Sequence, residues 1–287
     1  MKNFIQRAIT GVIFVAVLIG CIIGGPLPFG ILFCLISALA TVEFCQLMNQ
    51  QQGVHINRNI CTLGSITLFL CFFFYGMNPA ETNIFIPYLA ILIYLFISEL
   101  YLKKENPINN WAYAMFSQLY VALPFALLNV LAFQIIPTDT VSQYLFIFPL
   151  SIFIFNWMND TGAYCTGVLF GKHPLFKRIS PKKSWEGSIG GAVFCMAAAF
   201  ALAHFFPIYS TGEWIGLSLT VVVFGTWGDL TESLMKRQLG IKDSGNILPG
   251  HGGILDRFDS AMLAIPAAVV YLFALSIFNS STILEAA

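Results

Sequence analysis

The side chains best suited to chemistry lie in the last quarter of the chain. Six residues follow one another at steps of four, three, one, three and four, which places them on one face of a helix: Gly225, Asp229, Glu232, Ser233, Lys236 and Gly240. Two carboxylates, a hydroxyl and an ammonium on one wall could hold a metal ion and a phosphate. The alternative interpretation is an ion-pair network inside a membrane helix.

A glycine-rich segment with many charges follows, from Lys242 to Asp259. Its glycines allow positive φ and a close approach to a ligand, and consecutive amides in such turns bind anions. Four cations accompany it: Lys236, Arg237, Lys242 and Arg257. Asp256 and Asp259 are three residues apart, so both carboxylates can face one way; a helix cap is the alternative for Asp256. Carboxylates with phosphate oxygens are the usual ligands of Mg²⁺.

A third segment points to phosphate as well. Polar and small residues share one helix face between 156 and 167, which is either a packing seam or part of a site: Asn156, Asp160, Ala163, Tyr164 and Gly167. The basic stretch after it contains Lys183 and Ser184 and ends at a helix that begins near Gly187. The amino terminus of a helix attracts anions.

These segments belong to a chain built of apolar helices. Of the 287 residues, 57% are hydrophobic and 10% are charged, and the mean hydropathy is +0.79. Blocks of about 20 apolar residues are long enough to cross a bilayer as helices. We predict an all-α, polytopic integral membrane protein with about nine spans: 8–24, 27–48, 60–76, 84–101, 111–134, 143–170, 187–207, 214–235 and 259–278. We divide it into an N-terminal region, 1–142, and a catalytic region, 143–287.

Lysine and arginine set the orientation. With the N-terminus inside and the C-terminus outside, all 14 basic residues fall on the inside, as the positive-inside rule predicts. The active site is then expected on the cytosolic face. Glu43 and Glu99 in other spans favour a structural interpretation, such as pairing with lysine. The seven cysteines lie within or at the edges of spans and are interpreted as small buried hydrophobes.

From Ser233 to Asp259 the chain resembles the signature of the phosphatidate cytidylyltransferase family. The matching positions are Ser233, Met235, Lys236, Arg237, Lys242, Asp243, Gly245, Leu248, Pro249, His251, Gly252, Gly253, Ile254, Asp256, Arg257, Phe258 and Asp259. Two upstream stretches also resemble the family, Asp160 to Lys172 and Ser180 to Gly187. The resemblance is close over residues 155–260, and the first five spans match only in character.

The resemblance implies transfer of a cytidylyl group from CTP to phosphatidate, which forms CDP-diacylglycerol and pyrophosphate in the inner membrane. It implies Mg²⁺ as the cofactor, with a second, monovalent cation as a further candidate, and a homodimer. The charge asymmetry, basic inside and weakly acidic outside, suits lipid head groups or nucleotide phosphates, and no segment resembles a nucleic-acid module, so we expect no nucleic-acid partner. The implied metal ligands are Asp229, Asp256, Asp259 and Glu232. The implied catalytic residues are Lys183, Ser184, Lys236, Arg237, Lys242, His251 and Arg257, and the implied binding residues are Asp160, Ser233, Gly252 and Gly253.

Two other functions remain open from the sequence. A related membrane lipid kinase or a cytidylyltransferase for another lipid would use the same kinds of residue. An ion-coupled transporter would also place acids within spans, but it tends to have paired repeats and helices broken at midplane. No repeat is visible in this sequence, and its acids gather towards one edge of the spans.

Overall fold

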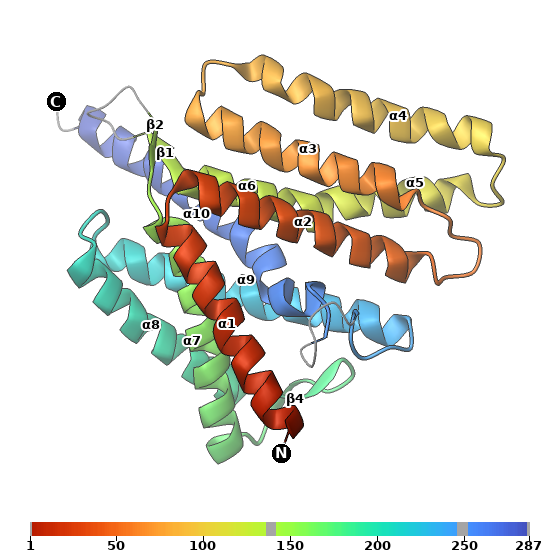
Figure 1. Cartoon of the computed structure of the whole chain (residues 1–287). Coiled ribbons are helices and arrows are strands. Elements are labelled where there is room, and N and C mark those ends of the chain that lie inside the picture. Colours follow the sequence, from red (N-terminus) through yellow and green to blue (C-terminus); the bar gives the residue numbers. More distant parts are fainter. Residues whose placement is uncertain (1, 136–141, 246–251, 286–287) are drawn as a thin grey trace. The chain divides into compact units, whose positions relative to one another are not determined.

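The structure is a computed structural model that describes residues 2–135, 142–245 and 252–285 (Figure 1). Its contacts divide the chain into two compact units. Unit 1 comprises residues 1–149 and 239–258, and unit 2 comprises residues 150–238 and 259–287. The glycine-rich segment therefore groups with the N-terminal helices, whereas the predicted division at residue 142 placed it with the C-terminal ones.

The helices follow the predicted spans closely. The elements of unit 1 are α1 (Lys2–Ile23), α2 (Pro26–Met48), α3 (Arg58–Met77), the 3₁₀ turn η1 (Thr82–Phe85), α4 (Ile86–Leu102), α5 (Pro107–Phe116), the π-helical η2 (Ser117–Ala122), α6 (Leu123–Ala132), β1 (Phe133–Ile135) and β2 (Ser142–Tyr144). The remaining elements are α7 (Ile147–Phe170), β3 (Pro174–Phe176), β4 (Ser180–Ser184), α8 (Trp185–Phe205), α9 (Thr211–Gln238) and α10 (Leu255–Glu285).

Within the described residues, seven helical segments are long and apolar enough to cross a membrane. The apolar part of α1 is shorter, Ile9–Ile23. The helix α7 has 24 residues, but Asn156, Asn159 and Asp160 interrupt its apolar run. The predicted all-helical membrane fold is confirmed. The number of crossings and their direction stay predictions.

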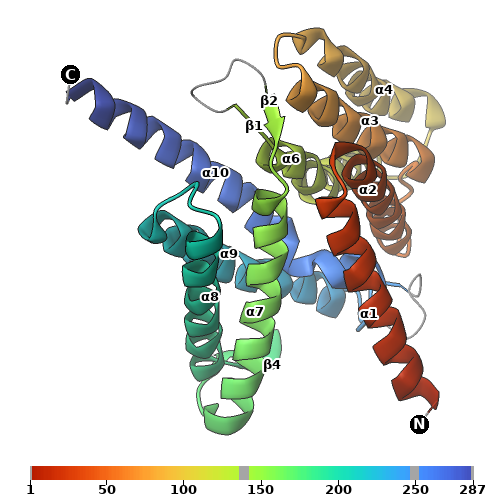
Figure 2. The ribbon, with the colours of Figure 1, turned by 60° about the vertical axis from the view of Figure 1, so that its left-hand side comes forward.

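Unit 1 is a bundle in which α3 packs against α2, α4 and α6 (Figures 1 and 2). Lipid chains are as apolar as leucine, so close packing and internal hydrogen bonds hold such helices together. Gly30 leaves room for the Phe73 ring, and the Ser37 and Ser65 hydroxyl groups are 2.7 Å apart, which joins α2 to α3.

Unit 2 is held by glycines where two helix pairs approach closely. A Cβ at Gly190 or Gly191 would collide with Thr166 or Asn159, so α8 lies directly on α7. A Cβ at Gly228 would collide with the backbone of Asp259 and Ser260, so α9 lies directly on α10. Glycine allows this because it has no side chain to separate the two backbones.

Two short antiparallel hairpins add to the helices. β1 pairs with β2 from Phe133–Tyr144 to Ile135–Ser142, and β3 pairs with β4 across residues 174–184. The sixth predicted span, 143–170, is the helix α7, which therefore begins at Ile147 rather than at residue 143. The predicted basic loop of residues 171–186 is largely the β3–β4 hairpin and the start of α8.

The predicted orientation can be tested with two exposed positions on opposite predicted sides. In a cysteine-free variant, a cysteine introduced as Glu81→Cys, between α3 and α4, should react with an impermeant maleimide in intact cells. One introduced as Lys177→Cys, in the β3–β4 hairpin, should react only after permeabilisation, because the positive-inside rule places it in the cytosol. Equal labelling of both in sealed cells would contradict the nine-span orientation.

Candidate active site

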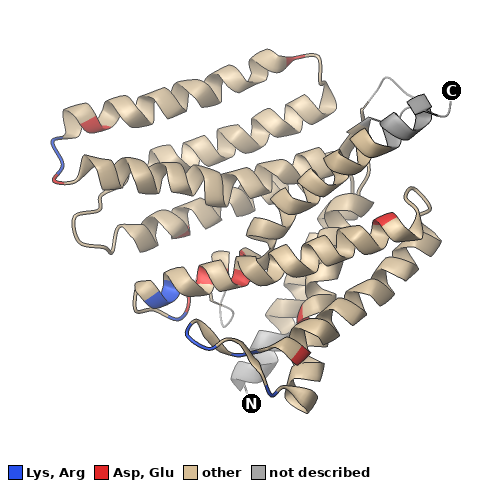
Figure 3. Cartoon of the chain, turned by 180° about the vertical axis from the view of Figure 1, so that it is seen from behind, with Lys and Arg blue, Asp and Glu red and all other residues tan. Residues whose placement is uncertain are grey.

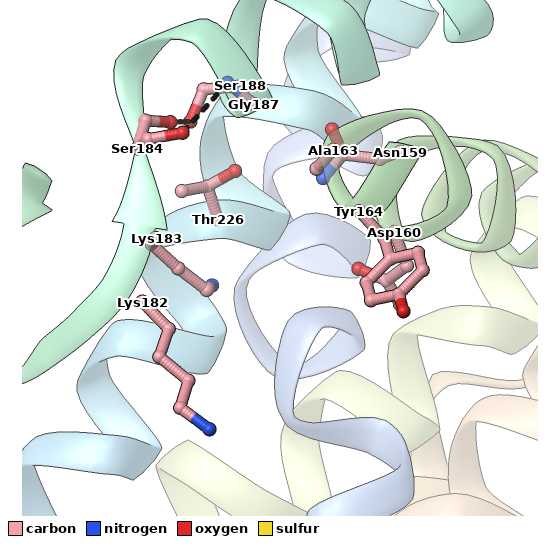
Figure 4. Close-up of a pocket in the computed structure, with 10 residues that line it drawn as sticks. All are labelled: Asn159, Asp160, Ala163, Tyr164, Lys182, Lys183, Ser184, Gly187, Ser188 and Thr226. Carbon is pink, nitrogen blue, oxygen red and sulfur yellow. Dashed lines mark hydrogen bonds between the residues drawn. The ribbon is translucent and has the colours of Figure 1, made fainter. Parts of the chain in front are cut away.

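A cavity of about 210 Å³ lies in unit 2 among α7, the β3–β4 hairpin, α8 and α9. Figure 4 shows Lys182 and Lys183 extending from β4, with Asp160 and Tyr164 projecting from α7. The complete lining is Asn159, Asp160, Ala163, Tyr164, Lys182, Lys183, Ser184, Gly187, Ser188 and Thr226. A pocket with two lysines and a helix amino terminus suits a phosphate-bearing ligand.

The cavity wall at β4 and α8 is fixed by a helix cap and by a second set of hydrogen bonds from Glu186. Ser184 is the N-cap of α8, and its Oγ accepts a hydrogen bond of 3.1 Å from the Gly187 amide. The Glu186 carboxylate accepts bonds of 3.2 Å from the amides of Lys172 and His173, and its Oε1 lies 2.6 Å from His173 Nδ1. These bonds hold the hairpin on the helix and thereby aim Lys183.

Lys183 forms an ion pair with Asp229 of α9. The second oxygen of Asp229 accepts a bond of 3.1 Å from the Ser233 hydroxyl, one helical turn further along. Lys236 pairs with the buried Glu232 at 2.7 Å. Figure 3 shows these acids followed by the basic residues of the last turn of α9. The predicted stripe from Gly225 to Lys236 therefore lies on one helix, and its carboxylates are paired with lysines. Its last predicted member does not belong to it, because α9 ends at Gln238 and Gly240 has a φ of 69°.

Four carboxyl groups of unit 2 lie near enough to repel one another. The charges of Asp229, Glu232 and Asp160 all act on the Asp259 carboxyl, and Asp229 acts on Asp160. Such crowding of negative charge within helices is costly. A divalent cation would relieve it, and carboxylate oxygens are the hard donors that Mg²⁺ prefers.

The donor set fits Mg²⁺ held jointly with a ligand. Among residues 2–135, 142–245 and 252–285, no three His, Cys, Asp or Glu side chains are gathered so as to hold a metal ion alone. Mg²⁺ usually takes one or two carboxylates, with substrate phosphates and water completing its shell. Asp229, with Asp259 and Asp160 near it, meets that requirement.

In unit 1, Asp256 ties together the two described flanks of the glycine-rich segment. Its Oδ2 accepts bonds of 2.8 Å from the Ser244 amide and 2.9 Å from the Gly253 amide. Gly252 has a φ of 81°, which only glycine adopts without strain. Asp256 therefore has a structural role, but not the helix cap considered as the alternative, because it is the second residue of α10 and accepts amides that precede the helix. Its pairing with Asp229 on one ion stays a prediction.

Four further predicted catalytic residues remain, three cations and one histidine. Arg237, Lys242 and Arg257 are exposed. His251 lies outside the described residues. Two cavity-lining residues escaped the sequence analysis, Asn159 and Thr226. Lys182 and Ser188 belong to the stretch predicted to attract phosphate, although neither was among the implied site residues. Asn159 stands one turn before Ala163, so its spacing could have revealed it.

Glu99 and Glu43 received a structural interpretation from the sequence. Glu99 confirms it, because its carboxylate lies 2.8 Å from Lys104 Nζ and accepts a bond of 2.9 Å from the buried Asn110 amide. Glu43 has no lysine partner of this kind. It accepts a hydrogen bond of 2.9 Å from the amide of Leu255, which belongs to the glycine-rich segment. No spacing in the sequence indicated that contact.

Comparison with known proteins covers nearly the whole chain. A phosphatidate cytidylyltransferase of Staphylococcus aureus (strain COL) is 34% identical over 263 residues, which are 91% of this chain and 95% of that protein. One of Haemophilus influenzae is 46% identical over 122 residues, 41% of this chain and 42% of that protein. Residues 5–275 match the profile of the cytidylyltransferase family. With the profile and a full-length relative in agreement, the chain belongs to the cytidylyltransferase family.

Proposed function

We propose that the protein is a membrane phosphatidate cytidylyltransferase, which forms CDP-diacylglycerol and pyrophosphate from CTP and phosphatidate. The observation that carries this proposal is similarity over 91% of the chain to an enzyme of that name. The geometry supports it, because a cavity with two lysines lies beside a group of carboxylates at the end of membrane helices. That is where a soluble nucleotide and a lipid phosphate could meet.

The reaction needs positioning more than it needs a strong base. A phosphate oxygen of phosphatidate attacks the α-phosphorus of CTP, and a P–O bond forms there. The bond from that phosphorus to the β-phosphate bridging oxygen breaks, and pyrophosphate leaves with the electron pair. A phosphate monoester is already a competent nucleophile near neutral pH. The remaining barrier is that of bringing two polyanions together and stabilising the leaving charge.

The chain's cations answer that need. Lys182 and Lys183 line the cavity, and the amino terminus of α8 adds the positive end of its helix dipole. Lys183 is held by Asp229 and Lys236 by Glu232, so both ammonium groups have fixed positions. We assign Lys183, Lys236, Arg237 and Arg257 to the phosphates of CTP and phosphatidate.

Mg²⁺, when bound, would neutralise phosphate charge and the carboxylates near Asp229. We assign Asp229 and Asp256 as its ligands, with Asp259 and Glu232 near it. We further propose that the site faces the cytosol and that the enzyme is a homodimer, as the family resemblance implies.

The direct test is an assay of the purified protein with CTP labelled on the α-phosphate. Phosphatidate should give a labelled lipid that releases CMP on mild hydrolysis, and pyrophosphate should appear in equal amount. A panel with a prenyl phosphate, an ether-linked phosphatidate and diacylglycerol separates the alternatives. Labelled product from another lipid alone would replace phosphatidate as the substrate. Labelled CDP without labelled lipid, formed only when diacylglycerol is present, would instead identify a lipid kinase.

The metal assignment predicts that Asp229→Asn and Asp256→Asn each lower kcat by on the order of 100-fold or more, the usual cost of removing a group that stabilises transition-state charge. Asp229→Asn should be partly rescued by higher Mg²⁺, since one ligand is weakened rather than lost. Glu105→Gln is the control and should keep near-normal activity, because Glu105 is an exposed acid outside the family signature. Near-normal activity of both variants would refute the assignment.

The reaction path predicts inversion of configuration at the α-phosphorus. Ser184 Oγ caps α8 and Ser233 Oγ donates to Asp229, so these two candidate hydroxyl groups already have structural roles. The lipid phosphate then attacks directly, in a single displacement. Turnover of one diastereomer of CTP-αS should give the inverted product. Net retention, or exchange of pyrophosphate into CTP without lipid, would indicate a covalent nucleotidyl-enzyme instead.

A further inference from the structure

Glu43 is a buried carboxylate in an apolar helix, and its contacts are with the glycine-rich segment. It is 2% exposed. Its Oε2 accepts a hydrogen bond of 2.9 Å from the Leu255 amide, 212 residues away in sequence. Its Oε1 occupies the space where a Cβ of Gly245 or of Gly253 would lie. The carboxylate therefore lies against residues on both sides of positions 246–251.

The surroundings of Glu43 favour its ionised form in some respects and oppose it in others. Burial and the nearby Asp256 carboxylate oppose the negative charge, while the hydrogen bond from the Leu255 amide stabilises it. An acid in an apolar helix without a compensating role is costly. The charge of Glu43 is stabilised by a backbone amide of the glycine-rich segment, whereas the charge of Glu99 is stabilised by Lys104.

Glu43 and Asp256 together form a clasp of two carboxylates. Asp256 accepts the amides of Ser244 and Gly253, which draws the two flanks of the segment together. Glu43 accepts the amide of Leu255, the first residue of α10, from the opposite element α2. The clasp fixes the first turn of α10, where Asp256 stands.

We propose that Glu43 is a positioning residue for the reaction: it holds the start of α10 and the flanks of the glycine-rich segment, and so places Asp256. The proposal rests on the proposed function for its link to turnover. It also gives the N-terminal helices a part in catalysis, although the motif residues lie later in the chain.

The charge and length of Glu43 are both needed. Glutamine keeps the size but turns one acceptor into an NH₂ donor beside backbone amides, which are donors themselves. Aspartate keeps the charge but shortens the reach by one methylene. The matched control is Glu99→Gln, which changes a second buried glutamate of unit 1, one that pairs with Lys104 and Asn110.

The first measurement is steady-state turnover, with thermal unfolding of each variant beside it. Glu43→Gln should lower kcat by about 10- to 100-fold, as loss of a group that orients a ligand usually does, while KM for CTP changes far less. Glu43→Asp should recover part of the loss. Glu99→Gln should keep near-normal kcat whatever its change in unfolding temperature. Equal kcat for Glu43→Gln and Glu99→Gln would overturn the proposal.

The second measurement does not depend on activity. Amide hydrogen exchange in peptides that contain Ser244, Gly253 and Leu255 should accelerate roughly tenfold in Glu43→Gln, since a hydrogen bond to a charged group is lost. It should stay unchanged in Glu99→Gln. Unchanged exchange in Glu43→Gln would overturn the positioning role even if the enzyme proved to use another substrate. An inactive wild-type protein with accelerated exchange in the variant would instead refute the proposed function alone.

A variant on the loop side guards against a failure of Glu43→Gln to fold. Gly245→Ala places a methyl group where the Glu43 carboxylate lies, so it should reproduce the same loss of kcat and the same faster exchange. Gly20→Ala, at a helical position in α1 where an added Cβ meets nothing within 4 Å, serves as its control. Normal turnover of Gly245→Ala would contradict the clasp.

Discussion

A negative charge inside an apolar helix is costly unless a partner lies beside it, and three such acids in the described structure have a lysine as that partner. Glu99 has Lys104 and Asn110, and Glu232 has Lys236. Asp229 has Lys183, which ties α9 to β4. Removing one member of a buried pair strands the other, at a cost of about 3–5 kcal/mol. The positions of the cations are therefore tied to those of the acids.

The same pairing of charges explains how the β3–β4 hairpin is held at the cavity. Lys183 reaches Asp229 only because β4 ends in the N-cap of α8, and Glu186 fastens that junction to the amides of residues 172 and 173. The glycines at 187, 190 and 191 let α8 lie against α7, so that Asp160 and the lysines line one cavity. Packing by small residues and charge pairing thus act on the same few elements.

Much of the fold could be predicted because membrane helices are specified by length and hydropathy, which are local. The hairpins could not, because β4 is five residues long and its Ser-Pro-Lys-Lys-Ser sequence has no strand pattern. The stripe from Gly225 to Lys236 followed from helical spacing alone. The role of Glu43 did not, since its contact with Leu255 joins residues 212 apart and leaves no periodic trace.

The difference between local spacing and long-range contact also matters for the family signature. Spacing predicts Asp256 and Asp259 as ligands on one helix face, but it says nothing about what fixes the start of that helix. The bonds of Asp256 to Ser244 and Gly253 show that one carboxylate oxygen already organises the segment. On the assignment that we propose, this metal ligand is held by backbone amides before any ion binds, which reduces the reorganisation needed during the reaction. Charge in the signature would then serve two purposes: it holds the signature's own backbone, as these bonds show, and it receives the phosphates of the substrates, as we propose.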